Sequence, residues 1–164
     1  MKWVRSTGVI ALAFLLSGCG AEFNPLFVES GSSGPVIGWR ECPGVKYDGI
    51  TEVGLYRWDH DGTADDPGQL LWHIKASHGI PLHRIRLGSS PQGFTTRLPL
   101  SVELDPASTY ALRTNMTSDD LVSGFLTFQP RQLDTGRVVF SDGEEASRKA
   151  YEDRDNEDFG CFTD

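Results

Sequence analysis

Four histidines lie within 24 residues near the middle of the chain, and imidazole is a frequent zinc ligand. They are His60, His73, His78 and His83. A zinc site needs three or four ligands that converge at about 2 Å, and no cysteine or suitably spaced carboxylate completes a set here. His73 and His83 fall on segments that we expect to be neighbouring strands, so these two could meet. Histidines on the surface of a sheet explain the pattern more simply.

A cluster of aspartates between two expected strands offers the hard oxygen ligands that Ca²⁺ prefers. Asp59, Asp61 and Asp65 are the weak metal candidates in this cluster. Their spacing does not match that of a calcium-binding loop, which also needs a distal glutamate. An acidic loop that keeps a sheet edge soluble is the commoner explanation, so we expect no cofactor.

The sequence offers little for nucleophilic catalysis. It contains no Gly-x-Ser-x-Gly motif, and no serine or cysteine stands in a recognisable nucleophile motif. Carboxylates are plentiful, but a glycosidase needs two of them held across a cleft, which one small domain seldom provides. We therefore expect a non-catalytic protein. The alternative is a small enzyme or metal-binding protein that uses the histidines and the aspartate cluster.

The overall charge excludes one class of partner. The chain has 15 basic and 23 acidic residues, a net charge of −8. Nucleic-acid binding needs surplus lysine and arginine to neutralise phosphates, so no nucleic-acid partner is expected.

The acidic chain nevertheless has a positive middle, because residues 69–102 contain no acidic residue. Its cations are Lys75, Arg84, Arg86 and Arg97. One hypothesis makes them a binding patch for an acidic envelope protein, an anionic polymer or a lipid headgroup. The other is internal complementarity, in which the acidic C-terminal segment lies over the basic strands.

The first 20 residues have the layout of an export signal. Lys2 and Arg5 precede an apolar stretch over residues 9–16, which is too short for a membrane span of about 20 residues. Leu16-Ser17-Gly18-Cys19 follows, and this motif resembles the lipobox of bacterial lipoproteins. In that family the cysteine receives a diacylglyceryl group and becomes the first residue of the mature chain. An ordinary secretory signal that happens to contain a cysteine is the alternative.

The lipobox resemblance implies a protein held on the extracytoplasmic face of the cell membrane. Two acyl chains on Cys19 give a stable hold, whereas one gives a marginal one. Loss of residues 1–18 removes two basic residues and leaves a net charge of −10. In a host with two membranes, anchoring in the outer membrane is also compatible with the sequence, because Gly20 is not the aspartate that typically marks inner-membrane retention.

Turn and linker chemistry follows the lipobox. The run Ser30-Gly31-Ser32-Ser33-Gly34-Pro35 is typical of a linker. We therefore predict three parts: a signal peptide at 1–18, a lipidated cysteine with a flexible tether at 19–34, and a folded domain at 35–164. The sequence leaves open whether the apolar residues of this tether dock on the domain or at the lipid interface.

Two cysteines remain if Cys19 carries lipid. An even pair in an oxidising compartment favours a disulfide between Cys42 and Cys161, against two buried free thiols.

From residue 35 onward, short apolar runs alternate with turn signals. The expected strands are residues 36–39, 50–58, 69–76, 82–87, 94–102 and 121–128. In the third of these, Trp72, Ile74 and Ala76 share one face. Such alternation predicts antiparallel sheets with one wet face.

Residues 104–113 carry a leucine, a proline and a tyrosine in the order Leu104, Pro106, Tyr110. This order resembles the approach to strand F in fibronectin type III and immunoglobulin-like domains. In those folds the tyrosine hydroxyl bonds to upstream backbone and fixes the corner between strands. The resemblance implies an immunoglobulin-like antiparallel β-sandwich, in which Tyr110 takes that role. A plain turn before a strand is the alternative.

The C-terminal part predicts one short helix. Ser141 stands three residues before Glu144, a capping-box arrangement, and residues 144–153 are good helix formers. The region from Gly34 onward also loosely resembles small uncharacterised lipoproteins of high-GC Gram-positive bacteria, a resemblance that implies no activity. We expect a lipid-anchored binding or structural module of the cell envelope.

Overall fold

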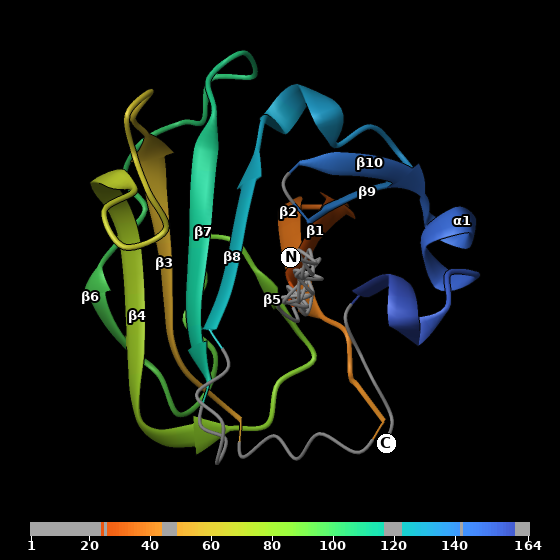
Figure 1. Ribbon diagram of the computed structural model, residues 1–164. Coiled ribbons are helices and arrows are strands. Elements are labelled where there is room, and N and C mark those ends of the chain that lie inside the picture. The colour runs from red at the N-terminus through yellow and green to blue at the C-terminus, as the bar shows by residue number, and fades with distance from the viewer. Residues whose placement is uncertain (1–23, 25, 44–48, 117–122, 142, 160–164) are drawn as a thin grey trace, which may run out of the picture.

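The protein is mainly β, and its computed structural model contains two five-stranded antiparallel sheets that face each other as a β-sandwich (Figure 1). The structure describes residues 24, 26–43, 49–116, 123–141 and 143–159. The coarse prediction of an antiparallel β-sandwich with a short helix is confirmed.

The first sheet has the strand order β10-β9-β1-β2-β5. Its strands are β1 (Leu26–Gly31), β2 (Gly34–Trp39), β5 (Arg84–Arg86), β9 (Arg137–Phe140) and β10 (Glu144–Ser147). β1 and β2 form a hairpin whose register pairs Leu26 with Trp39. Because of this pairing, the chain enters the sheet beside the last residue of β2.

The second sheet has the strand order β6-β4-β3-β7-β8. Its strands are β3 (Ile50–Trp58), β4 (Gly68–Ile80), β6 (Thr95–Leu98), β7 (Tyr110–Met116) and β8 (Ser123–Phe128). Ile50 pairs with Met116 on one side and with Ile80 on the other, so one end of β3, β4 and β7 carries three apolar side chains. We call this the Trp39 end of the sandwich, because Trp39 lies with Ile50 and Met116 around one pocket. The opposite end, where β7 begins, is the Tyr110 end.

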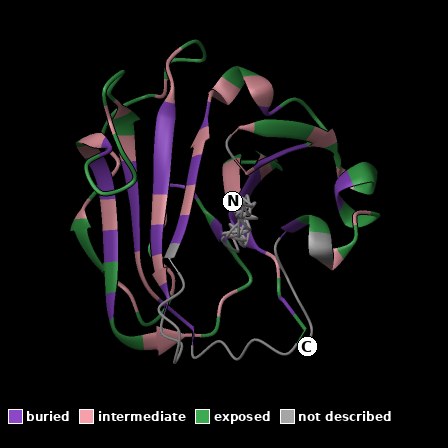
Figure 2. Ribbon diagram, viewed as in Figure 1, coloured by how far each residue is buried: buried purple, intermediate pink, exposed green. Residues whose placement is uncertain are grey.

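The core lies between the two sheets, where buried residues follow the facing sides of the strands (Figure 2). The expected alternation on β4 is confirmed, since Trp72, Ile74 and Ala76 are all buried. β3 spans the predicted residues, whereas β4 continues past the predicted end to Ile80. The bond predicted for Tyr110 is also present: the backbone N–H of Asp105 donates to the Tyr110 hydroxyl at 2.9 Å.

The predicted tether needs correction, because residues 26–31 are the central strand β1. Leu26, Phe27 and Val28 are buried, so the alternative in which the apolar residues dock on the domain describes this segment. The Ser/Gly run provides the hairpin turn between β1 and β2 rather than a linker. Gly34 there has φ +111°, a conformation that favours glycine.

The predicted C-terminal helix begins too early. Residues 144–147 pair with β9 as the edge strand β10, and α1 spans only Arg148–Glu152. Ser147, and not Ser141, caps it: the Ser147 side chain accepts from the Ala150 N–H. The physical reason is tertiary, since pairing with β9 overrides the helix propensity of the Glu-Glu-Ala run. Two 3-10 helices complete the fold, η1 (Pro130–Gln132) and η2 (Asn156–Phe159).

α1 and η2 form a layer against the outer side of the first sheet, which we call the C-terminal layer. Tyr151 and Phe159 pack on Phe27 and Phe140, with ring centroids 5.1 to 5.8 Å apart. Arg40, one residue past β2, donates to the carbonyls of Tyr151 at 3.1 Å and Arg154 at 2.8 Å. These contacts hold the C-terminal layer against the strand that also carries Trp39.

Candidate functional site

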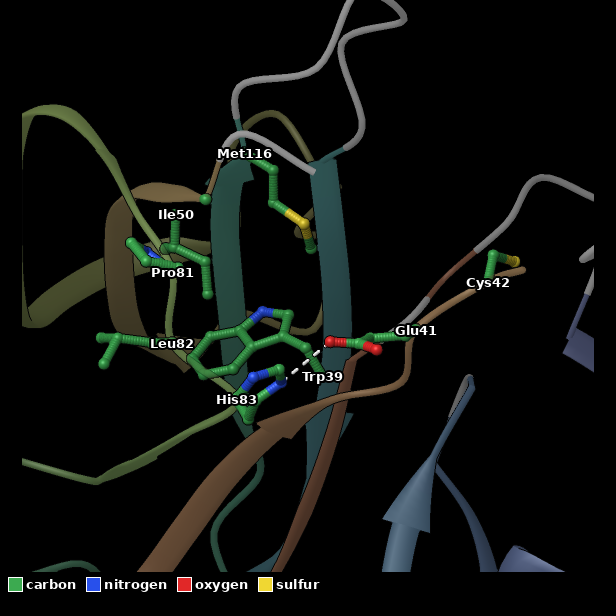
Figure 3. Close-up of a pocket in the computed structure, with 9 residues that line it drawn as sticks. Trp39, Glu41, Cys42, Ile50, Pro81, Leu82, His83 and Met116 are labelled. Carbon is green, nitrogen blue, oxygen red and sulfur yellow. Dashed lines mark ion pairs between the residues drawn. The ribbon is translucent and has the colours of Figure 1, made fainter. Parts of the chain in front are cut away.

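A pocket of about 300 Å³ opens at the Trp39 end of the sandwich; we call it the end pocket (Figure 3). Its lining combines apolar side chains with one ion pair at the rim. The lining residues are Trp39, Glu41, Cys42, Gly49, Ile50, Pro81, Leu82, His83 and Met116. The volume is at the low end of the range for small-molecule sites, about 300 to 1,000 Å³.

Strand register brings these residues together from four separate segments. Trp39 ends β2, Ile50 begins β3 and Met116 ends β7, so each is the terminal residue of its strand. The backbone N–H of Trp39 donates to the carbonyl of His83 at 3.1 Å, which ties the segment after β4 to β2. Three of the lining residues are therefore strand termini, and the other described ones lie on segments next to strand ends.

Trp39 supplies the main polar group inside the pocket. Its side chain is almost fully buried, with 8% of the residue exposed. Its indole N–H has no hydrogen-bond partner among the described residues. In Figure 3 the edge of the ring that bears this nitrogen faces the space between Ile50 and Met116. An unsatisfied buried donor costs about 1 to 3 kcal/mol, which an acceptor bound in the pocket would relieve.

Trp72 provides a useful contrast, because its indole N–H also lacks a partner within the described part of the chain. Trp72 is fully buried in the core between the sheets and does not line the end pocket. Of these two donors, that of Trp39 alone combines burial with an adjoining pocket.

The rim of the end pocket carries an ion pair between Glu41 and His83, with Oε1 and Nδ1 3.1 Å apart. Both side chains are mostly exposed. The described residues of the pocket lining include no lysine or arginine. A ligand that enters meets the paired Glu41 and His83 at the rim and the uncharged N–H of Trp39 inside, and these groups favour a neutral molecule over an anion.

A shallower groove of about 420 Å³ continues past the Glu41–His83 pair toward the C-terminal layer. Its cations are already engaged within the protein. Arg148 contacts Glu29 at 2.7 Å and Glu152 at 3.2 Å, and Arg84 contacts the same Glu29 at 3.4 Å. These ion pairs stabilise the contact between the first sheet and α1, so the groove is a weaker candidate for binding an anion.

The four histidines do not converge. His60 contacts Asp61, His73 contacts Glu52, and His83 contacts Glu41. His78 lies beside Ser77 instead. Among the described residues, no three metal-ligating side chains come together.

The aspartate candidates lie on an exposed loop at the Tyr110 end. Asp61 contacts the neighbouring His60 at 3.0 Å, and the almost fully exposed Asp65 accepts from Arg113 through its backbone carbonyl. Asp59 accepts from Gly62 through its backbone carbonyl, which closes a turn. The loop is thus held by its own backbone and by Arg113.

The structure divides the four central cations between the two sheets. Arg84 and Arg86 lie on β5 of the first sheet, whereas Lys75 and Arg97 lie on β4 and β6 of the second. Lys75 contacts Glu52 and Arg84 contacts Glu29. The ion pairs of the described C-terminal acids run to other cations, namely Arg137, Arg148, Lys149 and Arg154.

A polar cluster on the outer face of the second sheet was missed by the sequence reasoning. Glu52 lies 2.7 Å from His73 and 3.2 Å from Lys75, and it accepts from Asn115 at 3.3 Å. Partial burial alone would raise the pKa of Glu52, but the hydrogen bonds from Lys75 and His73 outweigh it and lower that pKa. The alternation of residues 52–58 and 69–76 is the signal that could have found this cross-strand cluster.

Two of the three cysteines, Cys19 and Cys161, lie outside the described residues. Cys42 is buried beside Phe159 in the C-terminal layer and takes part in a disulfide. Its pairing with Cys161, two residues after Phe159, stays a prediction.

No protein-family model, no curated protein and no solved structure matches this chain. Within the described ranges, none of the helices has the length and apolar character needed to cross a bilayer.

Proposed function

We propose that the protein is a lipid-anchored, extracytoplasmic β-sandwich of a bacterial cell envelope, and that it acts as a non-catalytic binding module. Cys19 carries the lipid, and the end pocket is the binding site. The anchor rests on the lipobox resemblance of residues 16–19. The binding role rests on the pocket and on the N–H of Trp39, which has no partner among the described residues.

One observation carries the proposal: β1 begins at Leu26, and the side chain of Asn24 already hydrogen-bonds to the Phe125 carbonyl of β8. Asn24 is five positions after Cys19, and a stretch of this length reaches at most about 18 Å when fully extended. The folded domain is therefore held close to the membrane surface. Since Leu26 pairs with Trp39, the chain arrives from Cys19 at the end that holds the pocket.

The finer fold type is part of the proposal. The neighbours β1-β2-β5 opposite β4-β3-β7-β8, together with the Tyr110 bond at the start of β7, support an immunoglobulin-like or fibronectin-like sandwich. A Cys42–Cys161 disulfide would add a covalent link between β2 and the C-terminal layer. Sandwiches of this kind host many functions, so the site and not the fold supports the binding role.

Metabolic labelling with a palmitate analogue in a bacterial host tests the anchor. We expect label on the wild-type protein and none on the Cys19→Ser variant. The matched control is Cys42→Ser, which should keep the label. An unlabelled wild-type protein that is nevertheless exported would show that the lipobox resemblance is misleading.

In-cell cross-linking of the anchored protein followed by mass spectrometry tests the binding role. Capture of one dominant envelope component would support a binding module and identify its partner. Capture of none would leave a small ligand or a lipid as the occupant of the pocket.

The alternative is a small envelope enzyme or metal-binding protein that uses the histidines and the aspartate loop. Each of His60, His73 and His83 faces a different carboxylate, which does not favour a shared metal. Elemental analysis of the purified protein separates the two proposals. A stoichiometric metal that is lost in a His73→Ala variant would favour the alternative.

A further inference from the structure

We propose that the end pocket binds a single hydrocarbon chain together with its neutral ester carbonyl, taken from a glycerolipid of the membrane that carries the protein. This inference rests on the proposed function, because the anchor is what brings the pocket to the lipid.

The lining selects an apolar ligand with one acceptor. Ile50, Pro81, Leu82 and Met116 provide apolar contact, and the indole N–H of Trp39 is a buried donor without a partner among the described residues. A hydrocarbon chain gains free energy by leaving water for such a surface. An ester carbonyl satisfies the N–H without bringing a charge into the pocket.

The same lining disfavours a free fatty acid. Glu41 stands at the rim, and no lysine or arginine is among the described residues that line the pocket. His83 at the rim is already paired with Glu41, so a carboxylate at the Trp39 N–H would be desolvated with no unpaired cation among the described lining residues, and Glu41 would repel it. The pocket should therefore distinguish an acyl ester from the corresponding acid.

The size and position of the pocket agree with a membrane source. A volume of about 300 Å³ suits part of one chain rather than a whole two-chain lipid. Asn24 is fixed to β8 no more than about 18 Å of chain from Cys19. A pocket at this end of the domain is within reach of lipid that moves a short distance out of the bilayer.

The test uses the full wild-type protein in phosphatidylcholine vesicles that contain a phosphatidylcholine with a photoactivatable diazirine on one acyl chain. After irradiation, mass spectrometry maps the cross-linked residues and reports the lipid on Cys19 in the same spectra. We expect cross-links at Ile50, Leu82 and Met116. A second pair of probes, a diazirine fatty acid and its methyl ester, should label these residues several-fold more as the ester.

Two variants test the roles of single side chains in the pocket. Trp39→Phe removes the donor and Leu82→Gln makes the rim polar, and each should lower pocket labelling several-fold while Cys19 stays lipidated. Val102→Gln, at an exposed apolar residue between β6 and β7, is the matched control and should change nothing.

The outcomes separate the inference from the proposed function. A lipidated Cys19 without cross-links in the pocket, or labelling unchanged in both Trp39→Phe and Leu82→Gln, overturns the lipid site and leaves the anchored module standing. Equal labelling by the acid and the ester overturns the ester specificity. Pocket cross-links on a protein with unmodified Cys19 overturn the anchor and keep the lipid site.

Discussion

The end pocket and the C-terminal layer lie on opposite sides of the same strand end. Trp39 and Arg40 are consecutive, and successive side chains of an extended strand point to opposite faces. Arg40 points into a region filled by the chain itself, where Tyr151, Arg154 and Asn156 supply acceptors. Trp39 points into a hollow, where its donor has none among the described residues.

The difference separates a structural contact from a binding site. Both regions combine aromatic rings with a hydrogen-bond donor. In the C-terminal layer the guanidinium of Arg40 stacks 4.1 Å from the Phe159 ring centroid and its donors meet carbonyls, so nothing is left for a ligand to satisfy. In the end pocket a cavity coincides with a donor that has no partner among the described residues, so an external acceptor would gain free energy there.

Replacement of Arg40 should give the largest effect on stability. Arg40→Ala removes hydrogen bonds to the Tyr151 and Arg154 carbonyls and the stacking on Phe159, and should lower the free energy of unfolding by about 3 kcal/mol. Urea unfolding measures this loss of free energy. The control is Arg86→Ala, an exposed residue on β5, with an expected change of at most about 0.5 kcal/mol. Equal effects of the two substitutions would contradict the clamping role of Arg40.

Alkaline pH should weaken the C-terminal layer through Tyr151. Burial raises the pKa of its phenol to about 12, although Arg40 nearby favours the phenolate. The unfolded chain ionises near pH 10, so the contribution of Tyr151 is present below pH 10 and is lost between pH 10 and 12. Between pH 10 and 12 the free energy of unfolding, measured in urea, should fall less for Tyr151→Phe than for the wild type. Parallel pH profiles for the two proteins would show that Tyr151 does not control this loss.

The Tyr110 end should respond more weakly, because one hydrogen bond is at stake. Tyr110→Phe leaves the Asp105 N–H without its acceptor and should cost about 1 kcal/mol of unfolding free energy. Tyr56→Phe is the control, since Tyr56 is only partly buried and its hydroxyl shows no bond to a described residue. A cost for Tyr110→Phe no greater than that of the control would remove the evidence for a structural corner.

The smallest effect on stability is expected at Trp39. Trp39→Phe loses some packing area, but it also removes a buried donor that lacks a partner, and these two changes offset each other to within about 1 kcal/mol. Thermal and urea unfolding of the ligand-free protein measure the balance. A loss as large as that of Arg40→Ala would show that the indole N–H is satisfied, and the contrast between the two regions would disappear.

Part of the sandwich was predictable because strands such as β4 alternate between buried and more exposed side chains. On β4, the apolar face of Trp72, Ile74 and Ala76 was correct, and so was the hydrogen bond of Tyr110. β1 was missed because the Ser/Gly run after it has the composition of a linker, although it serves as a hairpin turn. β10 was missed because Glu144, Glu145 and Ala146 favour a helix until β9 offers an edge to pair with.

The end pocket could not be predicted from local patterns. Its residues come from segments around positions 40, 50, 82 and 116, and only the register of β3 with β4 and β7 places their ends together. One local signal was present: Trp39, Ile50 and Met116 are large apolar residues at strand termini, where turn residues are usual. Such residues at converging strand ends mark the rim of a sandwich core.

The orientation of the domain on the membrane decides whether the end pocket faces the lipid. A photo-cross-linking amino acid is placed either at Leu82, beside the end pocket, or at Ala107, next to the Tyr110 end, in protein anchored in bacterial membranes. The account predicts lipid adducts from position 82 and few or none from position 107. Equal adducts from both positions, or adducts from position 107 alone, would contradict a membrane-facing pocket.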